Sequence, residues 1–286
     1  MVDTAPRAEY GATVDVLVLY TPTALAHVGS VNGMTMRVLN SNDQLNEAII
    51  KSDVRNTRVR VVGIEEIAFN ENNGVTPTAT RWLGYQSWVR LDPSATSRRD
   101  AYQADLVVML VHDNAAGAPC GVAYVQRPDC GLDAIPYEPG CDVGEDYNSF
   151  AYSIVHVGCS QANAIYAHEV GHQFGAEHQP QYAYAGIGSF VWSYAHYVNL
   201  VARDVMAYAS DCTSGNCPMQ LHFSNPHVNF FDGAGPPTGS FAPESMVDSR
   251  YRYSAKTLQY LAQGVANFRG ATAPADRILF SGFEPK

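Results

Sequence analysis

The stretch HEVGHQFGAEH, which runs from His168 to His178, constrains this chain more than any other feature of its sequence. Residues four apart lie on one face of an α-helix, so His168 and His172 can present two imidazoles to a single ion. Gly175 follows where that helix has to end, because glycine tolerates positive φ and permits a sharp exit. The turn would bring His178 back as a third nitrogen ligand. The stretch therefore predicts a helix, a tight turn and a zinc site.

Glu169 is predicted to be the general base at this site. It is rotated by about 100° from His168 at ~3.6 residues per turn, so it can reach a metal-bound water without occupying a metal position. Zinc lowers the pKa of that water, and Glu169 would accept its proton and pass it to the leaving amine. Three ligands leave a fourth position open, which distinguishes a catalytic zinc site from a structural one. We expect one catalytic Zn²⁺ ion.

Chance is the alternative explanation for such a pattern. A bare HExxH is short enough to occur by accident, and two histidines on a helix face have no default meaning. The added glycine and third histidine reduce chance occurrence in this chain to on the order of 10⁻⁵.

The composition is that of a folded protein, and we separately expect a monomer that acts on proteins or peptides. Of the 286 residues, 46% are hydrophobic and 16% charged, as in ordinary globular chains. The net charge of −10, without a run of Lys or Arg, gives no reason to expect a nucleic-acid or membrane partner. The longest apolar run, at 106–111, has the length of a strand. The first residues lack the apolar segment of a signal peptide, so we expect Met1 to be a start codon placed before a mature form.

Six cysteines, together with few lysines, indicate disulfides and a secreted, extracellular protein. One predicted pair flanks the turn-forming TSGN and a second brackets a Pro/Gly-rich excursion, which leaves the remaining two for each other. The expected pairs are Cys212–Cys217, Cys130–Cys141 and Cys120–Cys159.

Strand-like and helix-like segments alternate before the motif, which predicts an α/β lobe with a mostly parallel sheet. After His178 the chain becomes rich in loops, until Leu258 and its periodic apolar neighbours mark a helix from Ser254, its expected N-cap, to Gly270, its C-cap. Ser160 is the expected cap of the motif helix. Strands are expected at 12–21, 57–67, 105–113, 120–126 and 150–158, and helices at about 31–49 and 82–89, the second ending near Pro93.

The motif resembles the HExxHxxGxxH signature of the metzincin metalloendopeptidases, whose fixed positions are matched by His168, Glu169, His172, Gly175 and His178. Metzincins also have a Met-turn, a methionine beneath the metal, and Met206 in RDVMAYAS lies at a suitable distance. Astacin- and serralysin-type members carry a tyrosine two residues later, which Tyr208 matches, whereas reprolysin-type members lack it. The resemblance implies that Tyr208 is an additional zinc ligand or a donor to the developing oxyanion.

The stretches VDVLVLYTPTA, CGVAYV, VMAY and FSNP are similar to those of bacterial reprolysin-like metallopeptidases and their peptidyl-Asp group. This resemblance implies an α/β (α+β) fold. An upper lobe at about 11–175 would hold a five-stranded mixed twisted sheet with helices. A smaller irregular lower lobe at about 176–270 would hold the Met-turn and the C-terminal helix. We expect residues 1–10 and 271–286 to be tails of this catalytic domain, 11–270.

If this fold carries over, CGVAYV borders the cleft, and an extended substrate could add to it as a strand. Gly121, Val122 and Ala123 are the candidate substrate-binding residues. The peptidyl-Asp resemblance implies a preference for Asp after the scissile bond, which requires a cation in the pocket built after the Met-turn. Candidate cations are Arg203, Arg250, Arg252, His222 and His227.

The leading hypothesis is a secreted zinc endopeptidase. The alternatives are a catalytically silent adhesion or matrix-binding domain on the same scaffold and a zinc hydrolase acting on a non-protein amide. An acidic loop at 129–146 offers oxygen ligands for Ca²⁺, but it has no EF-hand spacing, and we expect a solvated loop. The other histidines are expected in the core or on the surface rather than as ligands: His27, His112, His156 and His196.

Overall fold

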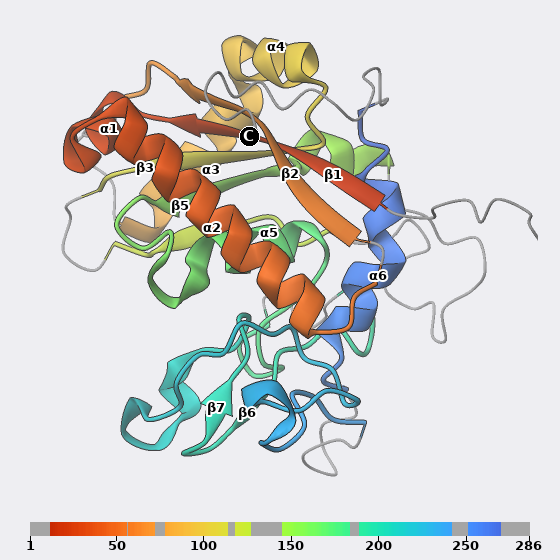
Figure 1. The fold of residues 1–286 in the computed structure, drawn as a ribbon. Coiled ribbons are helices and arrows are strands. Elements are labelled where there is room, and N and C mark those ends of the chain that lie inside the picture. Colours follow the sequence, from red (N-terminus) through yellow and green to blue (C-terminus); the bar gives the residue numbers. More distant parts are fainter. Residues whose placement is uncertain are drawn as a thin grey trace, which may run out of the picture.

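A five-stranded sheet forms the centre of the upper part of the molecule (Figure 1). The computed structural model describes residues 12–55, 57–71, 78–113, 118–126, 145–183, 189–241 and 251–269. The strand order is β2-β1-β3-β5-β4, and only β4 runs antiparallel to its neighbour, β5. The strands are β1 (Ala12–Tyr20), β2 (Thr57–Glu66), β3 (Leu106–Val111), β4 (Gly121–Ala123) and β5 (Tyr152–His156). The predicted α/β class and mixed sheet are confirmed.

Helices cover both faces of this sheet, so its central strand β3 is buried along its whole length. One face packs with α1 (Pro22–Val28), α2 (Val31–Lys51) and α5 (Ile165–Gln173), and the other with α3 (Thr78–Leu91) and α4 (Pro93–Tyr102). In Figure 1, α2 crosses in front of the sheet. The predicted apolar face of α2 is buried except at its first residue, Val31, which is 55% exposed.

The sequence prediction missed α4. Pro93 was expected to end a helix, but it also begins the next one, where its fixed φ suits the first helical turn. Asp92 caps α4, since its Oδ1 accepts a hydrogen bond from the amide of Ala95 at 2.9 Å. Strand β4 is also shorter than the predicted 120–126.

The start of α5 differs from the prediction as well. The Ser160 hydroxyl donates to the carbonyl of Val157 instead of capping the helix. A 3₁₀ turn, Ala162–Ala164, precedes α5, and Asn163 and Ala164 have φ values of 53° and 51°. Two consecutive left-handed residues that are not glycine therefore lead into the helix that carries the motif.

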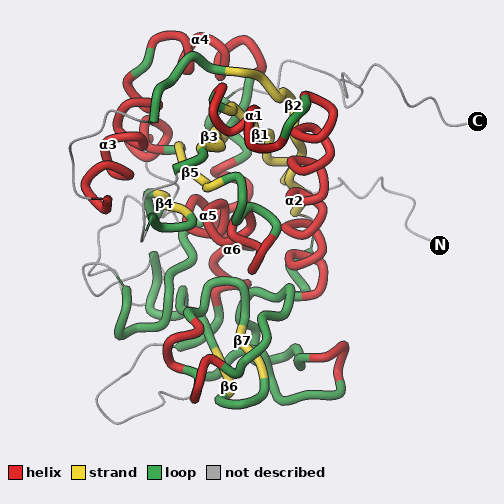
Figure 2. Tube along the Cα trace, turned by 90° about the vertical axis from the view of Figure 1, so that its left-hand side faces the viewer, coloured by secondary structure: helices red, strands yellow, loops and turns green. Residues whose placement is uncertain are grey.

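The lower part of the molecule is irregular, as expected (Figure 2). It contains the two-stranded pair β6 (Tyr197–Val198) and β7 (Ala202–Arg203) and the 3₁₀ helices Ala209–Asp211, Thr213–Gly215 and Phe231–Gly233. A further 3₁₀ helix, Glu145–Phe150, precedes β5. The final helix, α6 (Ser254–Val265), packs its predicted apolar face into the core. Ser254 is its first residue rather than its cap, and its hydroxyl accepts from the amide of Ser224 at 3.0 Å.

One apolar cluster joins the two parts of the molecule. It contains Val16 of β1 and Val170 of α5, and also Phe223 and Leu258 of the segments below and behind them. The parts above and below α5 are thus packed against each other through a continuous core.

Two of the three expected disulfides, Cys120–Cys159 and Cys212–Cys217, are confirmed. Cys130, Cys141, most of the acidic loop, Gly270 and both expected tails lie outside the described residues. Among the described helices, none has the length and apolar character required to cross a membrane.

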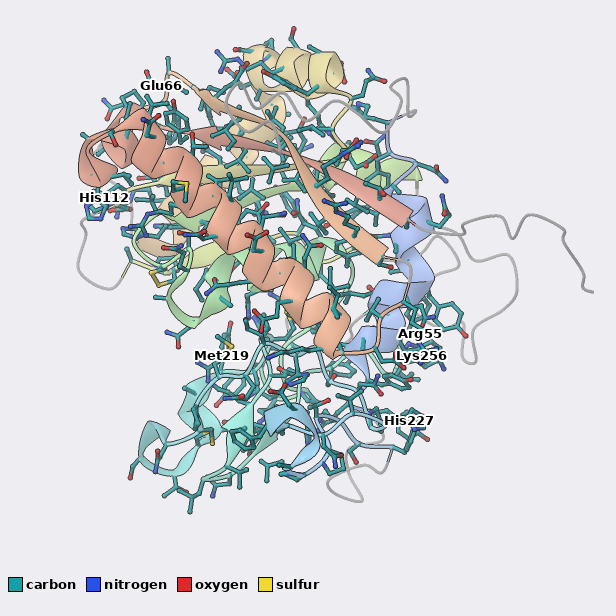
Figure 3. All side chains as sticks on the ribbon, in the orientation of Figure 1. Arg55, Glu66, His112, Met219, His227 and Lys256 are labelled. Atoms are coloured by element: carbon teal, nitrogen blue, oxygen red, sulfur yellow. A yellow bond between two sulfur atoms is a disulfide. The ribbon has the colours of Figure 1, made fainter. Side chains whose placement is uncertain are left out.

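Three of the remaining histidines gather at the carboxyl end of the parallel strands, where Figure 3 labels His112. The ring centroids of His27 and His112 are 3.9 Å apart, and those of His112 and His156 are 5.0 Å apart. Burial lowers the pKa of the partly buried His156, and desolvation together with the neighbouring His112 lowers the pKa of the more exposed His27. They belong to a packed aromatic group with Trp82, in agreement with the expectation for these histidines.

Candidate active site

Three histidine side chains converge at one point below the sheet. Helix α5 presents His168 and His172, and the chain after the helix returns His178 to them. The Nε2 atom of His178 lies 2.9 Å from Nε2 of His168 and 3.1 Å from Nε2 of His172. Nitrogens bound to one zinc at ~2.0–2.1 Å in a tetrahedral shell are about 3.3 Å apart, so the observed spacing is close to that of a zinc site.

The hydrogen bonds of the three rings leave their Nε2 lone pairs free. The Nδ1–H of His168 donates to the carbonyl of Val205, and that of His172 to the carbonyl of Ala176, each at 2.8 Å. Nδ1 of His178 faces the Glu177 carboxylate at 3.3 Å. Because a carbonyl only accepts, the hydrogen of His168 and that of His172 lie on Nδ1, which leaves Nε2 of each ring as a bare acceptor. Three imidazole nitrogens within ligand distance of one another could hold one metal ion, so the donor set fits zinc.

Burial keeps these imidazoles neutral. It lowers the pKa of His168 to about 4 and that of His172 to about 3, and it holds the pKa of His178 well below the usual range. A neutral imidazole is the form that binds a metal ion.

Gly175 makes the turn that returns His178. Its φ is +85°, and its amide donates to the carbonyl of His172 at 2.8 Å, which closes the end of α5. A Cβ at this position would lie 2.2 Å from the Ser189 hydroxyl oxygen, so both the backbone angle and the space demand glycine. The predicted sharp exit is confirmed.

Glu169 faces the edge strand across the cleft. A Cβ built on Gly121 would lie 2.2 Å from Oε1 of Glu169 and 2.6 Å from its Cδ. The missing side chain of Gly121 therefore makes room for this carboxylate. Burial raises the pKa of Glu169 well above its usual value, which makes the carboxylate a stronger base.

Met206 lies against α5 at Gly171, the residue before the second histidine of the motif. It is fully buried, and a Cβ on Gly171 would come within 2.6 Å of its sulfur. The Asp204 carboxylate shapes the turn, because it accepts from the amides of Met206 at 2.9 Å and His196 at 2.8 Å. The neighbouring Val205 carbonyl holds His168, so this turn and the motif helix are directly connected.

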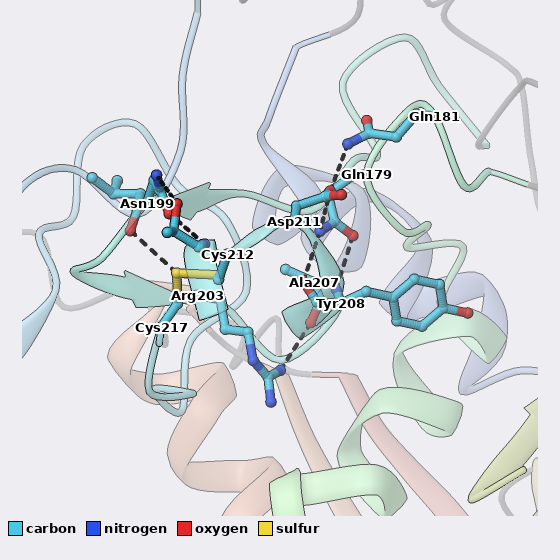
Figure 4. The surroundings of a disulfide bond; sticks show 11 residues. Gln179, Gln181, Asn199, Arg203, Ala207, Tyr208, Asp211, Cys212 and Cys217 are labelled. Atoms are coloured by element: carbon cyan, nitrogen blue, oxygen red, sulfur yellow. Dashed lines mark hydrogen bonds between the residues drawn. A yellow bond between two sulfur atoms is a disulfide. The ribbon is translucent and has the colours of Figure 1, made fainter. Parts of the chain in front are cut away.

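Tyr208 borders the histidines, as expected from its position two residues after Met206. Its ring centroid lies 4.2 Å from that of His178, and its side chain is 39% exposed. Burial, aided by the charge of Glu169, raises the Tyr208 pKa to about 12, so the hydroxyl is protonated at neutral pH. Gln179 clamps the backbone of Tyr208 by accepting from its amide at 2.9 Å and donating to its carbonyl at 3.1 Å (Figure 4).

These side chains line one cleft of about 910 Å³. Its walls include all three residues of β4, which were the candidate substrate-binding positions, and the three histidines, Glu169 and Tyr208. Of the described candidate cations, Arg203 alone lines the cleft. Arg252 is buried elsewhere, His222 packs against Phe230 and His227 is exposed beside Phe241, while Arg250 lies outside the described residues.

Sequence reasoning missed two residues of this site, Glu177 and Gln179. Both flank His178, and both are 1% exposed. Glu177 accepts from the amide of His178 at 2.8 Å and faces its Nδ1, as a carboxylate that orients a ligating histidine does. Their only sequence signal was a polar residue on either side of the third histidine.

Residues 11–238 match the sequence model of the reprolysin-like metallo-peptidase family M12B. The chain belongs to this family. The reprolysin-like family implies a zinc cofactor, for which the three histidines are present, and protein substrates.

Curated proteins named peptidyl-Asp metalloendopeptidase resemble this reprolysin-like chain. The one from Pseudomonas aeruginosa is 27% identical over 92% of the chain and 41% of its own length. The one from Stenotrophomonas maltophilia R551-3 is 27% identical over 77% of the chain and 46% of its own length. The one from Xanthomonas campestris is 26% identical over 79% of the chain and 48% of its own length. The chain thus spans less than half the length of these relatives.

A solved structure described as a chaperone–substrate complex shares the fold. Its TM-score is 0.62 at 16% identity, over 91% of this chain and 39% of that one. At that identity the likeness concerns the fold alone.

Proposed function

We propose that this chain is the catalytic part of a secreted zinc endopeptidase that hydrolyses internal peptide bonds of proteins. The observation that carries this proposal is the convergence of three bare Nε2 atoms beside Glu169 in an open cleft. His168, His172 and His178 would hold one zinc ion, and Met206 would support the helix that carries two of them.

The chain's own residues would divide the proton transfers between them. A bound zinc supplies Lewis-acid chemistry, which acidifies water and polarises a carbonyl. Glu169 takes a proton from the attacking water and gives it to the amine of the leaving peptide. The desolvated setting of its carboxylate strengthens it as a base for the first of these transfers.

The edge strand β4 would bind the substrate backbone. Among the described residues it pairs only with β5, so its other edge faces the cleft and can accept an extended peptide as a further strand. Val122 and Ala123 would offer their main-chain groups to this peptide. Gly121 would do so too, and its missing side chain also keeps Glu169 in place.

Replacing Gly121 with alanine is expected to lower kcat by about 10²-fold, because the added methyl forces Glu169 away from its position and removes general-base assistance. Zinc content should be unchanged. Gly84→Ala in α3 is the matched control, since a Cβ there meets nothing within 4 Å. Equal kcat values for the two variants would contradict this role of Gly121.

We further propose that Tyr208 donates its hydroxyl hydrogen to the oxyanion that develops on the attacked carbonyl. Tyr208→Phe removes that hydrogen and keeps the ring beside His178, so kcat should fall about 10-fold or more while KM changes little. The alternative role as a zinc ligand predicts weaker zinc binding in this variant. Metal content after dialysis therefore distinguishes the two roles.

The proposal also covers the location, the domain organisation and the specificity of the protein. Two disulfides favour an extracellular, secreted protein. The continuous core supports one catalytic domain at 11–270 with lobes meeting near residue 175, and we keep the expectation of a monomer. The names of the relatives support a preference for Asp after the scissile bond.

The function is tested by cleavage-site profiling on a denatured proteome, with chelator and with zinc added back. Zinc-dependent cuts within protein chains are expected, with Asp enriched after the scissile bond. A zinc-loaded, folded chain that makes no cuts would instead favour a silent binding domain, and cuts without acidic enrichment would remove only the Asp preference.

A further inference from the structure

We propose that Arg203 selects the substrate by binding the acidic side chain that follows the scissile bond. This inference rests on the proposed function, and it assigns to one residue the specificity that the function leaves without a structural basis. Arg203 is the last residue of β7, three residues before Met206. It lines the cleft together with His168 and Tyr208.

Two neutral acceptors hold the guanidinium of Arg203 against the cleft wall. Its Nη1 donates to the carbonyl of Ala207 at 2.8 Å (Figure 4), and its Nη2 donates to Oδ1 of Asn163 at 3.0 Å. Asn163 reaches it from the left-handed pair that precedes α5. Such backbone conformations persist where the surroundings hold them, and they are common at ligand sites. The arginine is thus fixed between the motif helix and the Met-turn.

No carboxylate among the described residues forms a direct ion pair with Arg203, and the charge that acts on its guanidinium is that of the neighbouring Asp204. The nearest acid in sequence, Asp204, already accepts from the backbone amides of His196 and Met206. Arg203 itself is only 8% exposed, and its Nε is buried without an acceptor. A buried cation that lacks a direct ion pair is stabilised when a further anion binds it.

The free donors of Arg203 suit a carboxylate. A guanidinium has five N–H groups in a planar fork, and the bonds to Ala207 and Asn163 use two of them. Because Nε is buried, the two groups left for a ligand are the second N–H of Nη1 and that of Nη2. These two can bind the two oxygens of one carboxylate, which an amide side chain of the same shape cannot match because it presents one oxygen and one NH₂. The chemical class selected is therefore an acidic side chain, with Asp distinguished from Asn.

Peptide binding to the zinc-loaded Glu169→Gln variant tests this role apart from catalysis. Two fluorescent peptides are compared by anisotropy, identical except for Asp or Asn after the scissile position. We expect Asp to bind about 10-fold more tightly or better, and the ratio of the two Kd values to approach one when Arg203→Gln is added. Arg203→Lys, which keeps the charge without the fork, should give an intermediate ratio.

Both peptides are titrated with the same protein preparation. Partial unfolding of a variant therefore changes both apparent Kd values and leaves their ratio unchanged. Arg98→Gln, which removes a partly exposed cation on α4, is the control and should keep the full ratio. The role of Arg203 is overturned if Asp is still preferred after Arg203→Gln is added. It is also overturned if the Glu169→Gln variant alone shows no preference for Asp. Failure of the wild-type chain to cleave any peptide defeats the proposed function instead, and the binding ratio is independent of that result.

Discussion

Replacing Glu169 with glutamine is expected to lower kcat/KM by about 10²–10⁴-fold while zinc remains bound. Glutamine has nearly the same shape, so it fits the space that Gly121 leaves, but it cannot accept a proton from water. The three histidines and their hydrogen bonds to Val205, Ala176 and Glu177 are untouched by the change. The measurement is the steady-state rate on a quenched peptide together with the zinc content of the dialysed protein.

Glu65→Gln is the control for Glu169→Gln. Glu65 is a partly exposed carboxylate on β2 that bonds to Tyr102, so its loss should leave the rate unchanged. A Glu169→Gln variant with wild-type activity would exclude Glu169 as the base. A variant that loses both activity and zinc would show that the carboxylate serves the metal site rather than the chemistry.

Replacing His172 with alanine is expected to remove both zinc and activity. His172 supplies one of three ligand nitrogens, and no other described side chain joins the group that could take its place. Loss of a residue that only orients a ligand typically weakens metal binding about 10–100-fold, so loss of the ligand itself should exceed that range. Zinc content after dialysis against a weak chelator and the peptide-cleavage rate are the two measurements.

His227→Ala is the matched control, since His227 is an exposed histidine beside Phe241, far from α5 (Figure 3). It should keep zinc and full activity. Far-ultraviolet circular dichroism of both variants separates metal loss from unfolding. Zinc retained at wild-type affinity by a folded His172→Ala variant would show that the metal lies elsewhere.

The parts of the site that follow local rules were predictable from sequence. Helical spacing brings His168 and His172 to one face, and the positive φ of Gly175 follows from the need to turn. The five strands were predicted correctly because apolar runs rich in β-branched residues, such as that of β3, are typical of buried strands.

Other parts depend on contacts between segments far apart in the chain. The approach of Gly121 to Glu169 and the bond between Arg203 and Asn163 each join residues about 40 or more positions apart, and no local pattern encodes them. The prediction that Ser160 caps α5 was wrong for a related reason. Its hydroxyl donates to the carbonyl of Val157, where the chain turns into the 3₁₀ segment. The helix end near Pro93 was predicted correctly, but the start of α4 was missed because proline is compatible both with the end of one helix and with the start of the next.

The continuous apolar cluster that joins the two lobes has a consequence for how the enzyme would fail. Val16 and Val170 of the upper lobe share a cluster with Phe223 and Leu258, so loosening of the lower lobe removes part of the packing on one face of the sheet, while the cluster under α3 and α4 belongs to the upper lobe alone. Heat, denaturant or a destabilising substitution in the irregular half should then disperse the zinc ligands and melt the sheet in a single cooperative step. Loss of bound zinc and loss of the fold should therefore follow the same transition curve.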